Sequence, residues 1–192
     1  METIRSFIAI ELPEQIRNDI GSLQSRLKTG GQNWLKWVSP DSVHLTLKFL
    51  GDIDSEKIPE ITQAIGESVS GISPFRLRVK GLGVFPNMKR IQVVWVGLTG
   101  DLDKLQKIQE NIEFNLAVLD YPEEGRQFTP HLTLARVKYA APAPEQDKFA
   151  VLLNSTAFES AAEVAVNSVS LMKSQLTPRG AIYNRVGSVP LG

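Results

Sequence analysis

The 192-residue sequence contains no cysteine and only two histidines, and its 21 basic and 21 acidic side chains cancel to a formal net charge of zero. Without cysteine there is no disulfide framework, no thiolate nucleophile and no zinc site with sulfur ligands. Without a net positive charge, no global electrostatic field holds a long nucleic acid, so any nucleic-acid contact has to be local. The side-chain chemistry that remains is that of oxygen groups and imidazole.

Long apolar runs and targeting signals are also missing. No run approaches the roughly 18 apolar residues that a membrane-spanning helix needs, and the first twelve residues lack a basic segment followed by a small-residue cleavage site. We therefore expect no membrane partner and a cytoplasmic location. The hydrophobic fraction of 42% and the charged fraction of 22% are those of an ordinary globular chain.

An apolar strand followed by an amphipathic helix recurs along the chain. Arg5–Glu11 favours a strand, and the apolar residues that follow Pro13 are spaced by four, three and four positions, as on one helix face. The same succession begins at Val43–Leu50, a strand that we expect to end at Gly51, before a helix capped by Asp54. Later copies comprise a strand over Gln92–Leu98, a helix capped by Asp101 and a helix over Pro144–Leu153.

One offset of 87 positions, the separation between His44 and His131, superimposes the two halves. It lays Arg5–Glu11 on Gln92–Leu98. It also lays the alternating segments 75–79 and 162–166 on each other. We infer a duplicated unit of two α+β lobes related by a pseudo-two-fold axis, in a single bilobal domain over residues 1–192 with one histidine in each lobe. The tail adds a hairpin, with strands at 169–172 and 181–186 joined by a turn over 176–180.

The two histidines occupy the same tetrapeptide, His-Leu-Thr-Leu, at equivalent points of the two repeats. Because side chains alternate along a strand, His44 and Thr46 share one face with Lys48, and His131 and Thr133 share one face of their own strand. The leucines of the motif point to the opposite face and anchor each strand in an apolar core; they are Leu45, Leu47, Leu132 and Leu134. The pseudo-two-fold axis then brings the two His-Thr pairs face to face across a groove.

Two imidazoles across a groove suit displacement at phosphorus, because one accepts a proton from the attacking oxygen while the other donates one to the leaving oxygen. The hydroxyls of Thr46 and Thr133 can donate to nonbridging phosphoryl oxygens, and this chemistry requires no metal. Two other interpretations stay open. Both histidines can be structural, or they can form a metal site, although no Asp or Glu shares the motif faces to complete the ligands.

The paired His-x-Thr-x (HxTx) motifs resemble those of the two-histidine (2H) phosphoesterase superfamily. Their flanks extend the resemblance over nearly the whole chain to the RNA 2′,3′-cyclic phosphodiesterase branch, the LigT-like proteins. The resembling segments are RSFIAIELP at 5–13, HLTLKFLGD at 44–52, GLGVFPN at 81–87, VVWVGL at 93–98, RQFTPHLTLAR at 126–136 and SQLTPRGAIY at 174–183.

The resemblance implies a bilobal fold with a groove between two antiparallel sheets and helices outside, and an RNA-processing hydrolase without a cofactor. Such an enzyme opens a 2′,3′-cyclic phosphate at an RNA end to a 2′-phosphomonoester, with His44 as proton donor and His131 as proton acceptor. Related members also join or open 2′,5′ linkages, a ligase activity in the reverse sense. We expect a monomer without an obligate protein partner.

Two other functions compete with this one. The same four motif residues can serve a phosphoesterase for a small cyclic nucleotide or an ADP-ribose cyclic phosphate. Alternatively, the chain is an RNA-end binding module without turnover, although binding alone does not need two groups that titrate near neutral pH.

Several residues outside the motifs have two interpretations each. Lys48 attracts phosphate or is merely solvated. Arg136 follows Thr133 by an odd number of residues, so an ideal strand points it away from the motif face; a bulge would re-aim it toward phosphate, and otherwise it forms a surface salt bridge. Three phenylalanines can stack on a base, although core packing is the better expectation for each; they are Phe49, Phe85 and Phe128. Core packing is also the expectation for Trp34, Trp37 and Trp95.

Overall fold

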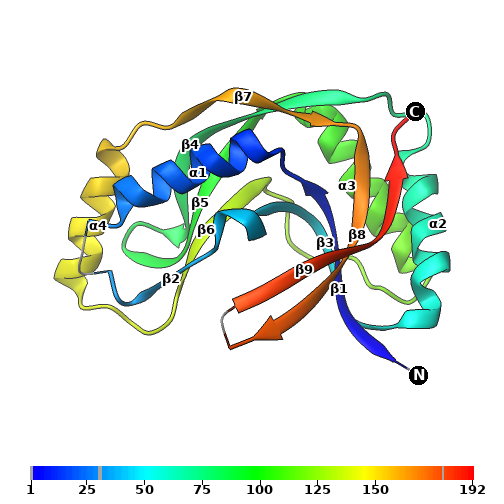
Figure 1. Ribbon diagram of the computed structural model, residues 1–192, viewed down its shortest axis with the longest axis horizontal. Helices are drawn as coiled ribbons and strands as arrows, with labels where there is room; N and C mark the ends of the chain where they lie inside the picture. Colours follow the sequence, from blue (N-terminus) through cyan, green and yellow to red (C-terminus); the bar gives the residue numbers. More distant parts are fainter. Residues whose placement is uncertain (1, 30–31, 179) are drawn as a thin grey trace.

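The computed structural model describes residues 2–29, 32–178 and 180–192, and these fold into two antiparallel sheets with four α-helices (Figure 1). The first sheet has the strand order β3-β1-β8-β9 and the second has the order β2-β6-β5-β4-β7. The strands are β1 (Thr3–Glu11), β2 (Leu35–Trp37), β3 (His44–Asp54), β4 (Phe75–Asn87), β5 (Arg90–Gly100), β6 (His131–Val137), β7 (Glu159–Val166), β8 (Ser168–Thr177) and β9 (Gly180–Pro190). The helices are α1 (Glu14–Leu27), α2 (Ile58–Val69), α3 (Leu102–Ala117), α4 (Ala143–Ser155) and the short 3-10 turns η1 (Pro40–Ser42) and η2 (Ser55–Lys57).

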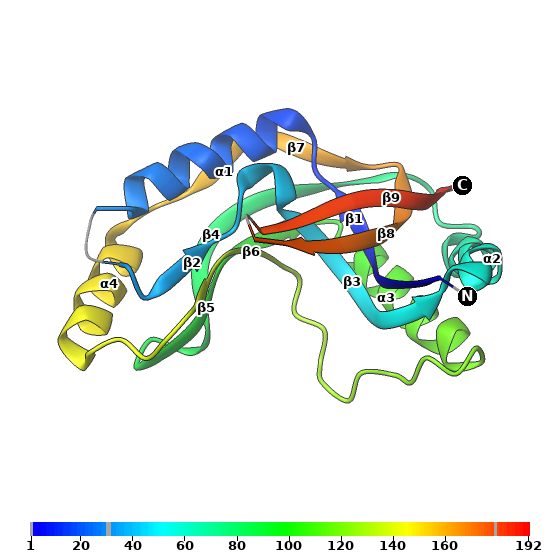
Figure 2. The ribbon, with the colours of Figure 1, turned by 60° about the horizontal axis from the view of Figure 1, so that its bottom comes forward.

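This arrangement confirms the predicted α+β class with two antiparallel sheets. Helices α2 and α3 pack together at one end of the molecule, while α1 and α4 lie at the other end (Figures 1 and 2). Within the described residues, no helix is both long enough and apolar enough to cross a membrane.

The spacing of apolar residues after Pro13 produces helix α1 as expected. The four residues on its predicted face are at most 1% exposed; they are Ile16, Ile20, Leu23 and Leu27. Burial of each such side chain stabilises the fold by about 1.5 to 3 kcal/mol. They belong to a core that is continuous from Ile8 and Leu45 in the first sheet to Val94 and Leu132 in the second. The two sheets therefore share one core.

The prediction that the strand ends at Gly51 is wrong. Strand β3 continues to Asp54, because Gly51 adopts a positive φ of 72° and the pairing with β1 resumes after a bulge, with Ser6 opposite Gly51. The Asp54 side chain then accepts the backbone N–H of Glu56 at 3.1 Å, so it caps the 3-10 turn η2 and not α2 itself. A glycine in the left-handed region here forms a bulge within the strand.

Asp101 also has a different role from the one predicted. It stands at the first position before α3 but makes no side-chain cap; its Oδ2 accepts the backbone N–H of Arg76 at 3.1 Å. Asp101 thus joins the start of α3 to the start of β4.

The strand pairing refines the comparison of the two halves. Phe7 pairs with Phe49 across β1 and β3, and Val93 pairs with Arg136 across β5 and β6. Residues 49 and 136 keep the offset of 87, whereas residues 7 and 93 differ by 86. The segment 5–11 therefore corresponds in the ladders to 91–97 and not to 92–98. The segments 75–79 and 162–166 do not lie in separate sheets: β4 and β7 are neighbours in the second sheet, with Phe75 opposite Val166.

The predicted C-terminal hairpin is present and longer than expected. Strands β8 and β9 pair from Ser168–Pro190 to Thr177–Gly180 and extend the first sheet. The Thr177 hydroxyl donates to the Gly180 carbonyl at 2.7 Å across the turn. Leu176 belongs to β8 and not to the turn, and Arg179 of the predicted turn lies outside the described residues.

Candidate active site

The two motif histidines are the first residues of β3 and β6, and these strands touch although they belong to different sheets. Both strands alternate as predicted over the motif. The histidine and threonine of each copy are half-buried, and the leucines are at most 3% exposed. The hydroxyls of Thr46 and Thr133 hydrogen-bond to none of the described residues, so both are available to a ligand.

Each imidazole is held by the backbone two residues before it. His44 Nδ1 lies 2.8 Å from the Ser42 carbonyl oxygen, and His131 Nδ1 lies 2.7 Å from the Thr129 carbonyl oxygen. A carbonyl oxygen only accepts, so each Nδ1 carries the proton and donates it. In the neutral rings Nε2 is then the basic nitrogen, and neither Nε2 has a hydrogen-bond partner within 2–29, 32–178 and 180–192. The same nitrogen of both rings is ready to exchange a proton.

Aromatic rings enclose both imidazoles. Phe7 stacks on His44 with ring centroids 4.5 Å apart, and Tyr183 meets the same ring edge-on at 4.9 Å. Phe85 meets His131 edge-on at 4.9 Å, and Trp95 lies 6.3 Å from it. These contacts fix the planes of the imidazoles and remove water from them.

Burial is the largest influence on both histidines, and it lowers the pKa of each imidazole below its ordinary value because the charged form loses hydration. The hydrogen bond from Nδ1 to the carbonyl opposes this by stabilising the charged form. The positive charge of Arg136 lowers both pKa values further, so this single guanidinium acts on both histidines. The charge of Arg136 is therefore close enough to both imidazoles to influence the protonation of each.

A bulge in β6 explains why Arg136 faces the site. Val94 pairs with Ala135 but Trp95 pairs with Thr133, which leaves Leu134 without a partner in the ladder. Leu134 and Ala135 are consequently both buried, and the alternation is reversed beyond them. Of the two interpretations of Arg136, this geometry favours the one in which a bulge re-aims the side chain.

The equivalent bulge in β3 overturns the expectation for Lys48. Ile8 pairs with Lys48 and Ala9 with Thr46, so Leu47 is the extra residue. Lys48 is turned away from His44 into the interior, where it is only 2% exposed and donates to Glu113 at 2.5 Å and to the Pro122 carbonyl at 2.8 Å. It is neither solvated nor available to a phosphate.

Phe49 takes the position in β3 that Arg136 has in β6. It is 58% exposed, with its ring centroid 6.2 Å from that of Phe7, so the expectation of core packing is wrong for this residue. The same expectation fails for Phe85, which contacts His131, and is correct for Trp34, which is buried against Phe149. Partly buried rings at Trp37 and Phe128 pack on the core.

Trp95 is also drawn into the site, because the absence of a side chain at Gly83 lets the indole lie flat on the neighbouring strand. A Cβ at Gly83 would fall 2.2 Å from the Trp95 ring. The ring in turn packs against Phe85 at 5.1 Å, beside His131.

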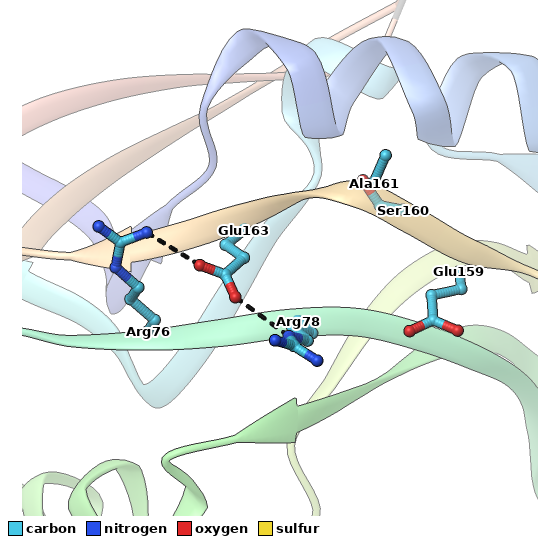
Figure 3. A pocket seen from close by; sticks show the side chains of 6 residues that line it. All are labelled: Arg76, Arg78, Glu159, Ser160, Ala161 and Glu163. Carbon is cyan, nitrogen blue, oxygen red and sulfur yellow. Dashed lines mark hydrogen bonds and ion pairs between the residues drawn. The ribbon is translucent and has the colours of Figure 1, made fainter.

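Two surface hollows lie away from the motifs. One is bounded by β4 and β7, where Glu163 accepts hydrogen bonds from Arg76 at 2.9 Å and Arg78 at 3.0 Å (Figure 3). The other is lined mainly by glutamates and glutamines and includes Arg126 and Phe128. Neither hollow contains a motif residue, and the described residues include no group of three or more potential protein ligands for a metal ion.

The sequence motifs did not reveal several groups around the histidines, among them Phe7, which stacks on His44. Glu11 is the cross-strand partner of His44, and Tyr183 reaches the same ring from β9. The carbonyls of Ser42 and Thr129 hold the rings. Ser42 and Thr129 each stand two positions before a histidine, so this equivalence could have been found in the sequence. The pairing of Glu11 with His44 could not, because it depends on strand register.

Known proteins are similar to this chain over nearly its whole length. The LigT like Phosphoesterase family model matches it twice, over residues 10–95 and 96–183. The RNA 2′,3′-cyclic phosphodiesterase of Methanothermobacter thermautotrophicus is 34% identical over 94% of this chain and 95% of that protein. The crystal structure of TT0787 of Thermus thermophilus has a TM-score of 0.78 at 28% identity, covering 98% of both chains. E. coli LigT complexed with 3′-AMP has a TM-score of 0.76 at 25% identity, covering 99% of both chains.

Proposed function

Because the chain belongs to the LigT like phosphoesterase family, we propose that it hydrolyses 2′,3′-cyclic phosphodiester ends of RNA to 2′-phosphomonoesters, with His44 and His131 as acid and base. The observation that carries this proposal is the matched pair of imidazoles. Each ring has its Nδ1 proton fixed on a carbonyl and its Nε2 unoccupied by any described residue. A relative that matches over 94% of this chain and 95% of its own length is named RNA 2′,3′-cyclic phosphodiesterase.

The proposed reaction moves two protons around one phosphorus atom. His131 Nε2 accepts a proton from water as the water oxygen bonds to phosphorus. The bond from phosphorus to the 3′ oxygen breaks, and His44 Nε2 donates its proton to that oxygen, which leaves the phosphate on the 2′ oxygen. His131 ends protonated and His44 neutral, and exchange with solvent restores both. Burial holds the pKa of both imidazoles low, and a low pKa suits His131 as the base at neutral pH.

The threonine hydroxyls and Arg136 would hold the nonbridging oxygens of the phosphate. Thr46 and Thr133 stand two residues after each histidine on the same strand face, and Arg136 supplies positive charge to both halves of the site. Phe49, at the position in β3 that Arg136 has in β6, is our candidate for contact with the terminal nucleoside. An exposed ring beside the catalytic face is suited to stacking on a base.

Loss of either threonine hydroxyl is expected to slow the chemical step. Thr46→Ala and Thr133→Ala should each lower kcat by up to about 10²-fold, because a hydroxyl donor to the developing charge on phosphate is lost. Steady-state kinetics on a 2′,3′-cyclic mononucleotide measure this, with the Ser variants as controls that keep the hydroxyl. Wild-type kcat in both Ala variants would exclude this role.

Turnover is expected to need no divalent metal, since the proposed chemistry uses two imidazoles, two hydroxyls and one guanidinium. The measurement is the hydrolysis rate before and after treatment with EDTA and dialysis. The rate should not change. A loss that is restored by adding Mg²⁺, Mn²⁺ or Zn²⁺ would contradict this prediction.

Product analysis tests the function itself. Oligonucleotides of increasing length with 2′,3′-cyclic phosphate ends, a cyclic mononucleotide and an ADP-ribose cyclic phosphate are incubated with the protein and separated by chromatography. The proposal expects a 2′-phosphomonoester as the product of the oligonucleotides; binding without product would identify a binding module. We also propose that the chain acts as a monomer, because one chain carries both motif strands, and that it acts in the cytoplasm.

A further inference from the structure

The two histidines have nearly equivalent surroundings. Each begins its strand, donates from Nδ1 to the carbonyl two residues earlier and meets an aromatic ring edge-on. Arg136 acts on both. Nothing in these shared contacts decides which imidazole gives the proton and which one takes it.

One carboxylate breaks this equivalence. Glu11 on β1 is directly opposite His44 on β3, where side chains of an antiparallel pair lie roughly 4.5 to 5.5 Å apart at Cβ. Its Oε2 accepts from Arg185 Nε at 2.7 Å and from the Ser170 hydroxyl at 2.8 Å. Partners on β8 and β9 thus hold the carboxylate beside the imidazole.

The corresponding place beside His131 has no side chain. Gly97 is the cross-strand partner of His131. A Cβ added at Gly97 would lie 2.8 Å from the Lys80 carbonyl oxygen, so the fold does not accept a longer residue there without a backbone shift. The asymmetry between the two halves is therefore built into the strand packing.

We propose that Glu11 is the positioning residue that makes His44 the acid: its fixed carboxylate stabilises the protonated imidazole of His44, and no group at the equivalent position does so for His131. This inference rests on the proposed function and explains its direction of proton transfer. Glu11 acts through His44 and need not touch the substrate.

Among the charges around His44, that of Glu11 acts in the direction that this assignment requires. Burial alone would raise the pKa of Glu11, but the hydrogen bonds from Arg185 and Ser170 outweigh it and hold that pKa below its ordinary value, so Glu11 stays ionised while imidazole titrates. Burial, the largest influence, and the charge of Arg136 hold the pKa of His44 below its ordinary value, while the hydrogen bond to the Ser42 carbonyl and the charge of Glu11 raise it. Tyr183 also contacts the His44 ring, and its own pKa is raised, mainly by burial, so that it is neutral in this range.

The test uses the fact that the protein has two histidines and hence two imidazole Cε1–H signals in a ¹³C-edited NMR spectrum. The His131→Ala variant assigns them, and both are titrated against pH in wild type and in Glu11→Gln. The midpoint of His44 is expected to move to lower pH in Glu11→Gln, with that of His131 unchanged. Arg185→Gln removes the cation that partly neutralises the Glu11 carboxylate. The titration midpoint of His44 should therefore move to higher pH in this variant.

Two control variants keep the test specific. Glu2→Gln removes a carboxylate whose partner is Lys173 and which contacts neither histidine, so neither midpoint should move. Ser170→Ala removes a hydrogen bond to Glu11 but no charge, and the change at His44 should be smaller than in Glu11→Gln. An unmoved His44 midpoint in a folded Glu11→Gln protein, or equal movement of both histidines, would overturn the proposal.

Kinetics supply the second measurement. In Glu11→Gln the alkaline limb of the pH profile of kcat/KM should move to lower pH, and the rate on a cyclic mononucleotide at pH 7.5 should fall by roughly 3- to 10-fold. A movement of the acid limb instead would assign the effect to the base and contradict the proposal. The NMR titration needs no turnover, so a protein inactive on every cyclic phosphate would refute the proposed function while the titration still decides whether Glu11 acts on His44.

Discussion

The His44→Ala and His131→Ala variants are each expected to hydrolyse a 2′,3′-cyclic nucleotide roughly 10²- to 10⁴-fold more slowly than wild type. They should differ on a phosphodiester with a nitrophenol leaving group. A departing sugar alkoxide needs a proton, whereas nitrophenolate leaves without one, so the lost acid matters less with this ester. We expect it to restore part of the rate in His44→Ala and none in His131→Ala, which still lacks its base.

The measurement is the ratio of kcat/KM on the two substrates for wild type and both variants, with the double variant as the baseline. Recovery in His131→Ala alone would reverse the roles of acid and base. Equal recovery in both variants, or in neither, would remove the support for separate roles. In wild type the same assignment predicts a bell-shaped pH profile, because one imidazole has to be neutral and the other protonated.

Replacement of Lys48 by alanine is expected to lower the free energy of unfolding by about 3 to 5 kcal/mol, as when one partner of a buried ion pair is removed. The Lys48 side chain is 1% exposed and that of Glu113 is 10% exposed, at 2.5 Å. Without Lys48, the Glu113 carboxylate keeps the Gln109 amide and the Glu124 backbone N–H but loses its only cationic partner among the described residues. Urea denaturation followed by circular dichroism measures the effect.

The double variant Lys48→Met with Glu113→Leu is the matched control. It removes both charges and keeps apolar volume, so its stability should be much closer to wild type than that of Lys48→Ala. If the single and double variants were equally unstable, the unpaired charge would not be the cause, because the double variant has none; the lost hydrogen bonds to Pro122, Gln109 and Glu124 would then explain the effect. If Lys48→Ala were as stable as wild type, the pair would contribute nothing.

The motif itself was predictable because period-two alternation decides which side chains share a face. His44, Thr46, His131 and Thr133 needed only two residues of regular strand. Arg136 and Lys48 lie beyond a bulge, and a single extra residue exchanges the faces of everything that follows. The periodicity of the sequence does not show that Leu47 and Leu134 are bulge residues without a partner in the neighbouring strand.

The helices were predictable because their apolar faces are long and regular, as in α1. Strand partners were not, since they depend on contacts far apart in the sequence. Thus β4 joins the second sheet, and the correspondence of β1 with β5 differs by one residue from that of β3 with β6. The position of Glu11 opposite His44 also depends on this register, so it could not be predicted from the sequence.

The junction between β7 and β8 constrains how the site can move. Val166 ends a strand of the second sheet and Ser168 begins a strand of the first, so Asn167 alone separates them, and its carbonyl accepts the Leu191 N–H at 2.9 Å. A junction of one hydrogen-bonded residue offers little freedom for rigid-body closure, and the shared core opposes it as well. We therefore expect the distance between the two imidazoles to be fixed by the fold and to change little when a ligand binds. Substrates would then be selected by whether their phosphate fits a fixed gap between two nitrogen atoms.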